Sequence, residues 1–231
     1  MLNNKKILAV IPARGGSKGI KLKNLKKIRN KSLISIVAFF IKKCFFFDYS
    51  VLSTDNNKIK KEAKKNNLKV IDRPKKLSGD RVSDTNVLIH AVKETEKNLN
   101  HKFDIIVMLH PTSPLRNIKD IKGSIKKLIV SKLDSVWTIS KTDSKYHPDK
   151  QLILKRGRLS YFSKKGAKII YRQQLGQVYY RNSAAYVLDR NFLIKKKKLI
   201  GNKSSGYIVK DKQVSIDTIK DLKLANLLYK K

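Results

Sequence analysis

The chain of 231 residues has a single cysteine, Cys44, and no hydrophobic run long enough to cross a membrane. One cysteine excludes an intrachain disulfide and a metal site built from several thiolates. The longest apolar segment, residues 32–41 (SLISIVAFFI), lies between two lysines and is too short to span a bilayer. Because no secretory signal is evident either, we expect a cytoplasmic protein that is not bound to a membrane.

Acidic residues are also scarce. The chain has only 17 Asp and Glu but 54 Lys and Arg, which gives a formal net charge of +37. Such a charge can indicate a nucleic-acid or membrane-surface partner. However, 44 of the basic residues are lysine, spread over the whole chain, whereas proteins that read bases favour arginine. We interpret the charge as a compositional bias and expect no specific nucleic-acid partner.

Short apolar segments alternate with segments of helical spacing through the first 140 residues. The order predicts an α/β fold with an open, mostly parallel sheet flanked by helices. Residues 142–185 are polar and aromatic and break this rhythm, which predicts an inserted flap or dimer arm. A strand near residues 207–216 and a last helix at 218–229 follow, and we expect a single domain over residues 1–231. The segments are strands at 6–11, 50–53, 70–71, 104–109 and 135–139, and helices at 31–46, 57–66, 84–99 and 118–131.

A glycine-rich loop, IPARGGSKGIKLKN (residues 11–24), follows the first predicted strand. Open parallel sheets bind ligands at the carboxyl ends of their strands. The loop lacks the glycine spacing of a Walker A loop and the Rossmann pattern G-x-G-x-x-G. Its backbone amides can still approach an anion, and Arg14, Lys18 and Lys23 would supply charge toward a triphosphate. The alternative is a tight strand-to-helix turn with incidental lysines.

An ordered series of motifs continues from this loop to the end of the chain. It resembles the acylneuraminate (CMP-sialic acid and nonulosonic acid) cytidylyltransferase family, whose fold is a Rossmann-like nucleotidyltransferase sheet. The resemblance implies transfer of CMP from CTP to the anomeric hydroxyl of a nonulosonic acid, with release of pyrophosphate. Transfer to the eight-carbon acid Kdo, or a degenerate basic module for nucleic acid or anions on the same fold, is the alternative. The motifs are residues 52–55 (LSTD), 73–74 (RP) with Leu77 and Asp80, 111–116 (PTSPLR), 172–175 (RQQL), Asn182 with Tyr186, and 216–218 (IDT) with 221–222 (DL).

The resemblance also implies the residues of the site. No Ser, Cys or His nucleophile is required, because the hydroxyl of the acceptor attacks the α-phosphorus; the enzyme supplies positioning, cations and Mg²⁺. Residues 142–185 would pack on a second subunit and complete its sugar site in a homodimer. The implied catalytic residues are Arg14, Lys18, Lys23 and Asp217; the nucleotide ligands are Ala13, Arg14, Gly15, Ser17, Asn24, Arg73, Ser83 and Asp84; the sugar ligands are His110, Arg172, Gln173, Asn182 and Tyr186; and the metal ligands are Asp217 and Ser215.

Three positions depart from the family pattern. His110 stands where relatives that use sialic acid commonly have glutamine, and Ser183 replaces a glycine, so legionaminic and pseudaminic acids remain open as the acceptor. Ser215 replaces the first aspartate of a D-x-D pair, in which both carboxylates would face Mg²⁺. We therefore expect the site to bind metal weakly before CTP arrives. The four histidines of the chain show no metal-ligand spacing.

Overall fold

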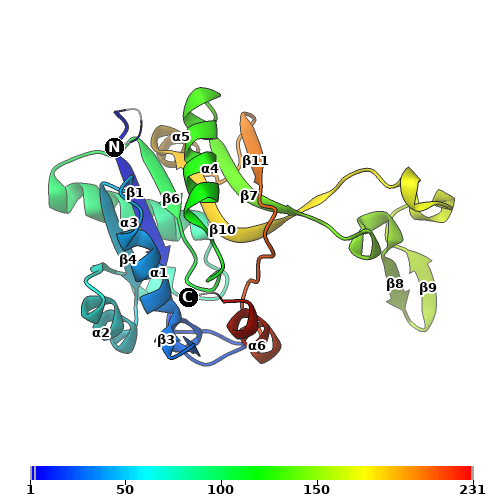
Figure 1. The fold of residues 1–231 in the computed structure, drawn as a ribbon, viewed down its shortest axis with the longest axis horizontal. Coiled ribbons are helices and arrows are strands. Elements are labelled where there is room, and N and C mark those ends of the chain that lie inside the picture. The colour runs from blue at the N-terminus through cyan, green and yellow to red at the C-terminus, as the bar shows by residue number, and fades with distance from the viewer. Residues whose placement is uncertain (1, 3, 230–231) are drawn as a thin grey trace.

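The computed structural model, which describes residues 2 and 4–229, consists of an α/β body and an arm that projects from it (Figure 1). A seven-stranded sheet in the order β11-β7-β10-β6-β1-β4-β5 forms the centre of the body. Strand β10 runs antiparallel to β6 and β7, and the other pairs in the sheet are parallel, which confirms the predicted fold class. The strands are β1 (Ile7–Pro12), β4 (Tyr49–Thr54), β5 (Lys69–Asp72), β6 (Ile105–Met108), β7 (Ser135–Lys141), β10 (Tyr179–Asp189) and β11 (Ser204–Ile208).

Helices cover both faces of the sheet. The core under α1, α2 and α4 takes Ile7, Ala9 and Ile11 from β1, and the core under α3 and α5 takes Leu8 and Val10. Successive side chains of a strand point to opposite faces, and burial on both faces explains why β1 is continuously apolar. The α-helices are α1 (Leu33–Lys42), α2 (Asn57–Lys65), α3 (Asp84–Leu99), α4 (Ile118–Val130), α5 (Arg190–Lys196) and α6 (Ile219–Leu228).

Besides the two cores of the sheet, a smaller cluster of buried hydrophobic residues lies between α6 and a two-stranded hairpin. The hairpin consists of β2 (Lys27–Ile28) and β3 (Lys31–Ser32). Ile20 of the glycine-rich loop and Ile216 of the segment before α6 are buried in the cluster. The cluster therefore holds the loop and residue 217 against the same part of the body. The short 3-10 helices of the body are η1 (Lys23–Leu25) and η2 (Lys75–Leu77). None of the helices in the described ranges is long and apolar enough to cross a membrane.

Helix ends follow local capping chemistry. The hydroxyl of Ser83 accepts a hydrogen bond from the Asn86 amide at the start of α3, and Asn100 ends this helix in the left-handed conformation at φ 47°. Both are preferred cap residues, and the predicted bounds of this helix agree with the structure. At the start of α6, Thr218 and Asp221 form a reciprocal capping box.

The last third of the body differs from the sequence expectations. Strand β10 already begins at Tyr179, so the part that projects is shorter than the predicted flap, and we use "arm" for residues 142–178. The strand predicted near residues 207–216 is wrong in position: β11 covers Ser204–Ile208, and residues 209–217 cross to α6 without regular structure. Helix α5 was not predicted. The last turn of this helix is basic, and Leu193 is its one fully buried residue. The sequence therefore lacks the repeated apolar positions that predict a helix.

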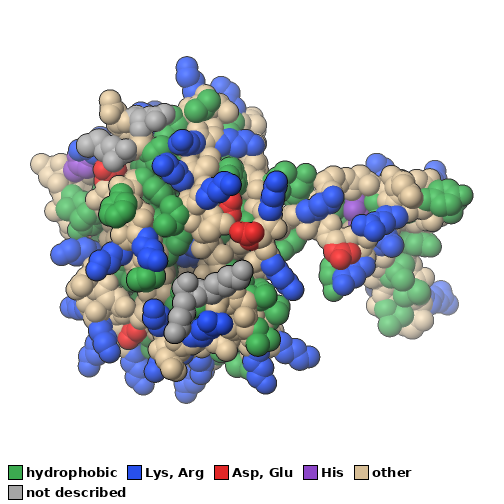
Figure 2. Space-filling model, viewed as in Figure 1, with side chains coloured by type: hydrophobic (Ala, Val, Ile, Leu, Met, Phe, Trp, Pro, Cys, Tyr) green, Lys and Arg blue, Asp and Glu red, His purple; other side chains and the backbone are tan. Residues whose placement is uncertain are grey.

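The arm contains a hairpin, β8 (Leu152–Lys155) and β9 (Arg158–Tyr161), and four single-turn helices. Every residue of both strands is exposed. Figure 2 shows hydrophobic side chains on the surface of the arm, together with several lysines and arginines. The exposed hydrophobic residues of the hairpin are Leu152, Ile153, Leu154, Leu159 and Tyr161. The arm thus carries an apolar surface that its own chain does not cover. Its single-turn helices are η3 (Ser144–Tyr146), η4 (Pro148–Lys150), η5 (Gly166–Lys168) and η6 (Arg172–Gln174).

Candidate active site

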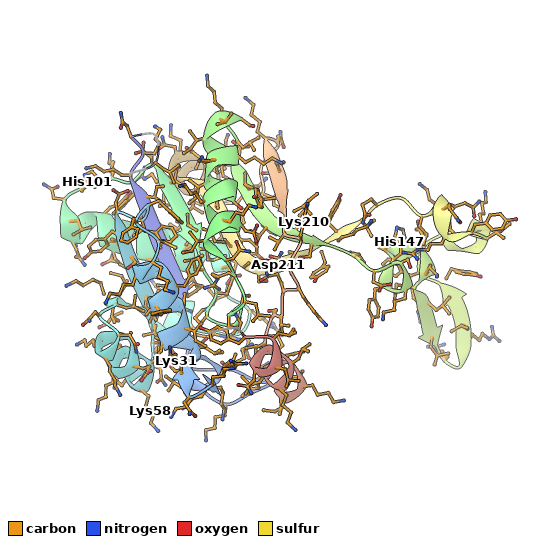
Figure 3. All side chains as sticks on the ribbon, in the orientation of Figure 1. Lys31, Lys58, His101, His147, Lys210 and Asp211 are labelled. Carbon is orange, nitrogen blue, oxygen red and sulfur yellow. The ribbon has the colours of Figure 1, made fainter. Side chains whose placement is uncertain are left out.

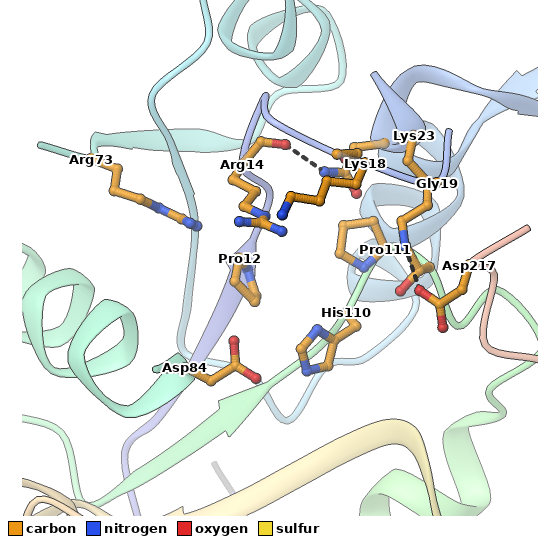
Figure 4. Close-up of a pocket in the computed structure, with 13 residues that line it drawn as sticks. Pro12, Arg14, Lys18, Gly19, Lys23, Arg73, Asp84, His110, Pro111 and Asp217 are labelled. Atoms are coloured by element: carbon orange, nitrogen blue, oxygen red, sulfur yellow. Dashed lines mark hydrogen bonds and ion pairs between the residues drawn. The ribbon is translucent and has the colours of Figure 1, made fainter. Parts of the chain in front are cut away.

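A cavity of about 400 Å³ lies beyond the carboxyl ends of β1 and β6 (Figure 4). This is the edge of the sheet where the glycine-rich loop leaves β1, as expected for an open α/β sheet. The sequence-predicted residues that line the cavity are Arg14, Ser17, Lys18, Lys23, Asn24, Arg73, Asp84, His110 and Asp217. Those that do not line it are Ala13, Gly15, Ser83, Arg172, Gln173, Asn182, Tyr186 and Ser215.

The sheet itself fixes the start of the glycine-rich loop. The Ala13 amide donates to the Ser53 carbonyl (2.9 Å) and continues the pairing of β1 with β4. Two residues later, the Gly15 amide donates to a carboxylate oxygen of Asp55, also at 2.9 Å. The LSTD motif therefore contacts backbone amides of the loop. Ala13 and Gly15 shape the loop but do not line the cavity.

Asn24 and Gly19 hold the far side of the loop. The buried Asn24 amide donates to the Arg14 carbonyl at 3.1 Å, so it closes the loop onto itself. A Cβ atom on Gly19 would lie 2.5 Å from the carbonyl oxygen of Asp217. Because no side chain fits there, glycine lets the loop pack directly against the backbone at residue 217.

The three loop cations are each paired with a carboxylate. Arg14 and Lys18 contact the two oxygens of Asp80, each at 2.8 Å, and Lys23 contacts Asp217 at 2.7 Å. The hydrogen bond from Lys18 holds the pKa of Asp80 below its ordinary value. Negatively charged oxygens therefore already occupy positions between these cations, as a phosphate group would.

Arg73, just after β5, and Asp84, at the start of α3, both line the cavity. Arg73 is buried and donates to the carbonyl (2.8 Å) and the hydroxyl (3.2 Å) of Ser53. Burial lowers the pKa of Arg73 to about 10, against the opposing charges of Asp55 and Asp84, so it stays protonated at neutral pH. Asp84 lies in the first turn of α3 and faces the cavity opposite His110 (Figure 4), whereas the Ser83 hydroxyl caps the helix.

His110 lies just after β6. Its carbonyl accepts hydrogen bonds from the Ser113 amide (3.1 Å) and from the Arg116 guanidinium, so the PTSPLR segment turns back on it. Its ring stands edge-on to Tyr186, with 5.7 Å between the centroids. Burial lowers the pKa of His110, and the positive charges of Arg116, Lys23 and Arg181 act in the same direction, whereas Asp84 raises it.

Asp217 and Ser215 flank the buried Ile216, whose amide donates to the Thr112 carbonyl at 2.9 Å. Across the described parts of the chain, no three His, Cys, Asp or Glu side chains come together as a metal site. Mg²⁺ bound with a nucleotide needs one or two carboxylates, since phosphate oxygens and waters supply its other ligands. The exposed carboxylate of Asp217 at the cavity edge fits that requirement, with the Ser215 hydroxyl nearby in sequence.

A family model described as cytidylyltransferase matches residues 8–231. The chain belongs to the cytidylyltransferase family. It is 32% identical to a pseudaminic acid cytidylyltransferase of Campylobacter jejuni over 97% of each chain. It is 28% identical to a CMP-N,N'-diacetyllegionaminic acid synthase of the same species, over 96% of this chain and 94% of the other. A solved structure of CMP:2-keto-3-deoxy-manno-octonic acid synthetase complexed with CTP shares the fold, with a TM-score of 0.73 at 16% identity, covering 96% of this chain and 98% of that one.

In this cytidylyltransferase, the predicted sugar ligands lie in two separate places. Arg172 and Gln173 belong to η6 of the arm, where Arg172 and His147 line a second cavity of about 480 Å³. The His147 ring, labelled in Figure 3, contacts the Gly176 carbonyl (3.0 Å) and accepts from the Asp149 amide (3.1 Å). It therefore has a structural role in the arm, away from the first cavity.

Asn182 and Tyr186 lie in the bulged part of β10. The buried Asn182 side chain accepts from the Thr138 hydroxyl (2.7 Å) and donates to Ser140 (2.9 Å), so it ties β10 to β7. Ser183 has φ 58°, which explains why glycine suits this position. Tyr186 is buried and does not line the first cavity, but its ring contacts His110, which does.

Sequence reasoning missed two acidic residues of the site. Asp55 and Asp80 both belong to motifs that carry the family resemblance, which was the available signal. Their partners lie far away in sequence, at Gly15 for one and at Arg14 and Lys18 for the other. A motif identifies such residues, but only the fold assigns their contacts.

Proposed function

We propose that this cytidylyltransferase transfers CMP from CTP to the anomeric hydroxyl of a nonulosonic acid and releases pyrophosphate. One observation carries the proposal: three cations of one loop converge on carboxylate oxygens at the ligand-binding edge of the sheet. The relatives named for pseudaminic and legionaminic acids support this class of acceptor. We propose the cytoplasm as the compartment of this reaction.

The reaction needs charge and positioning rather than a protein nucleophile. Arg14 and Lys18 leave Asp80, and Lys23 leaves Asp217, to bind the triphosphate of CTP. Arg73 and Asp84 line the side assigned to the base and ribose, and Asn24 keeps the loop in shape. Mg²⁺, held by Asp217 with Ser215 beside it and by the phosphates, would supply further positive charge for the departing pyrophosphate.

The active form in this proposal is a homodimer. Two leucines that pair across the arm hairpin, Leu154 and Leu159, are 71% and 65% exposed. Exposed apolar surface of this kind marks an interaction site. The arm also holds Arg172 and Gln173 outside the cavity lined by its own body. A second copy that receives the arm would cover its leucines and gain an arginine suited to the acceptor carboxylate.

A substrate panel tests the function. The enzyme is incubated with CTP, Mg²⁺ and pseudaminic, legionaminic or sialic acid in turn, and pyrophosphate release is measured. We expect turnover with at least one of these nine-carbon acids. Release with Kdo alone would favour the eight-carbon alternative, and no release with any acid would refute the proposal.

A further inference from the structure

The His110 ring is held in one orientation by contacts that leave its nitrogens available. Tyr186 lies edge-on against it at an interplanar angle of 77°, and Tyr186 stacks on Trp137 at 4.2 Å between centroids. The Trp137 indole is itself anchored, because it donates to the Leu199 carbonyl at 3.0 Å. This stack, together with the two donors on the His110 carbonyl, fixes both ends of the residue.

Within residues 2 and 4–229, no protein group forms a hydrogen bond with either ring nitrogen of His110. Figure 4 shows the ring within the cavity, between Asp84 and the turn that carries Asp217. His110 is half-buried, so its side chain can be reached from the cavity. An imidazole that is positioned by an aromatic contact and by its backbone, and whose nitrogens have no protein partner beside a substrate cavity, is suited to accept a proton from a substrate.

The other acidic or basic groups of the cavity are poorer proton acceptors. Asp217 is paired with Lys23 and is the carboxylate assigned to the metal. Asp84 lines the side of the cavity assigned to the base and ribose of CTP. The charged groups around His110 are Asp84 on α3, Lys23 on η1, Arg116 after β6 and Arg181 on β10, and Tyr186 is the titratable neighbour.

These surroundings keep the imidazole neutral. Burial and the three cations lower the pKa of His110, and Asp84 opposes them. A neutral imidazole is a base of moderate strength that can accept a proton at physiological pH. The hydroxyl that attacks the α-phosphorus must lose its proton during the reaction.

We propose that His110 is the catalytic base that removes this proton from the anomeric hydroxyl of the acceptor. This inference rests on the proposed function. In the step, the hydroxyl O–H bond breaks and its proton moves to a ring nitrogen of His110. The oxygen forms a bond to the α-phosphorus, and the bond from the α-phosphorus to the bridging oxygen breaks, so that pyrophosphate leaves with the electron pair.

The test compares His110→Gln with wild type over a range of pH. Glutamine is the residue of sialic acid relatives, so it fits the site and can still hydrogen-bond a sugar, but it cannot accept the proton. We expect kcat to fall about 10²- to 10⁴-fold, with the Kd for CTP unchanged. In wild type, kcat/KM should fall as the pH drops through the lowered pKa of His110, and this acid limb should disappear in the variant.

The matched control is His101→Gln, at a histidine that lies at the other end of the sheet (Figure 3) and should leave the acid limb in place. A His110→Gln variant that keeps the acid limb, or that raises only the acceptor KM, would overturn the inference and assign His110 to sugar binding. Absence of wild-type turnover with every acid would instead overturn the proposed function, and the inference with it.

Discussion

The nucleotide end and the acceptor end of the proposed active site differ in how their predicted ligands are distributed over the chain. The nucleotide end, formed by Arg14, Lys18, Lys23 and Arg73, lies entirely around the cavity of a single body. The acceptor end divides its predicted ligands between the body and the arm, with Arg172 on the arm.

The two ends also rest on different kinds of support. Loop residues of the nucleotide end follow strand β1, which is buried on both faces. The arm hairpin is two-stranded and exposed throughout, and an isolated hairpin of this size is marginally stable. CTP binding should therefore be a property of one chain, whereas turnover should depend on a partner that covers the arm.

The strongest test of the nucleotide end removes a loop cation. Arg14→Ala or Lys23→Ala should each lower kcat/KM by about 10²- to 10³-fold, because preorganised charge at the phosphates is lost. CTP binding, measured by calorimetry, should weaken as well. Lys195→Ala removes the same charge from the end of α5 and should change neither quantity. Equal behaviour of all three variants would show that the loop is ordinary basic surface.

The matching test of the acceptor end breaks the arm contact. Leu154→Asp combined with Leu159→Asp places two charges on the paired apolar surface of the hairpin. We expect a monomer by light scattering and a loss of turnover of about 10²-fold from misplaced acceptor ligands, with the Kd for CTP unchanged. Phe45→Asp is the control, since Phe45 is the 93% exposed aromatic of the body. An active monomer would contradict the proposed division of the site.

The same division explains how much the sequence could predict. Most residues of the nucleotide end belong to one loop, residues 14–23, which directly follows an apolar strand. The sequence of this segment is therefore enough to predict that the loop lies at the edge of the sheet. The parallel strands and the α3 bounds follow from apolar segments and caps such as Ser83 and Asn100.

The acceptor end depends on contacts that no local pattern encodes. The start of β10 is polar and aromatic, and a register shift between Arg181 and Tyr186 interrupts its pairing, so it reads as part of the flap. The Asp80 pairs with Arg14 and Lys18 join segments more than sixty residues apart. The position of Arg172 on the arm depends on where the chain leaves the sheet.

The metal site expected at Asp217 and Ser215 gives a further test of the nucleotide end. Ser215→Asp restores a second carboxylate beside Asp217, which adds charge for a hard cation. We expect about a tenfold lower Mg²⁺ concentration for half-maximal rate, and detectable Mg²⁺ binding by calorimetry without CTP. Ser215→Ala should lose less activity than Asp217→Asn, which should be nearly inactive. If Asp217→Asn kept its activity and its Mg²⁺ dependence, the metal site would lie elsewhere.

The smallest expected effect comes from Asp80, which bridges two loop cations before CTP binds. CTP must displace its carboxylate, so Asp80→Asn should tighten CTP binding, by about two- to fivefold as for exposed ion pairs. The gain should shrink as salt rises, because screening weakens the pairs that are removed.

The lowered pKa of Asp80 sets the pH dependence: the carboxylate competes with CTP above this pKa and loses its charge as the pH falls through it. Wild type and variant should therefore bind CTP equally at low pH and diverge above it, and comparing the two cancels the titration of CTP itself. Asp72→Asn, which breaks the surface pair with Lys60 at 2.8 Å, is the matched control and should leave CTP binding unchanged. Weaker CTP binding by Asp80→Asn across the whole pH range would show that Asp80 orients the loop cations for the triphosphate instead of competing with it.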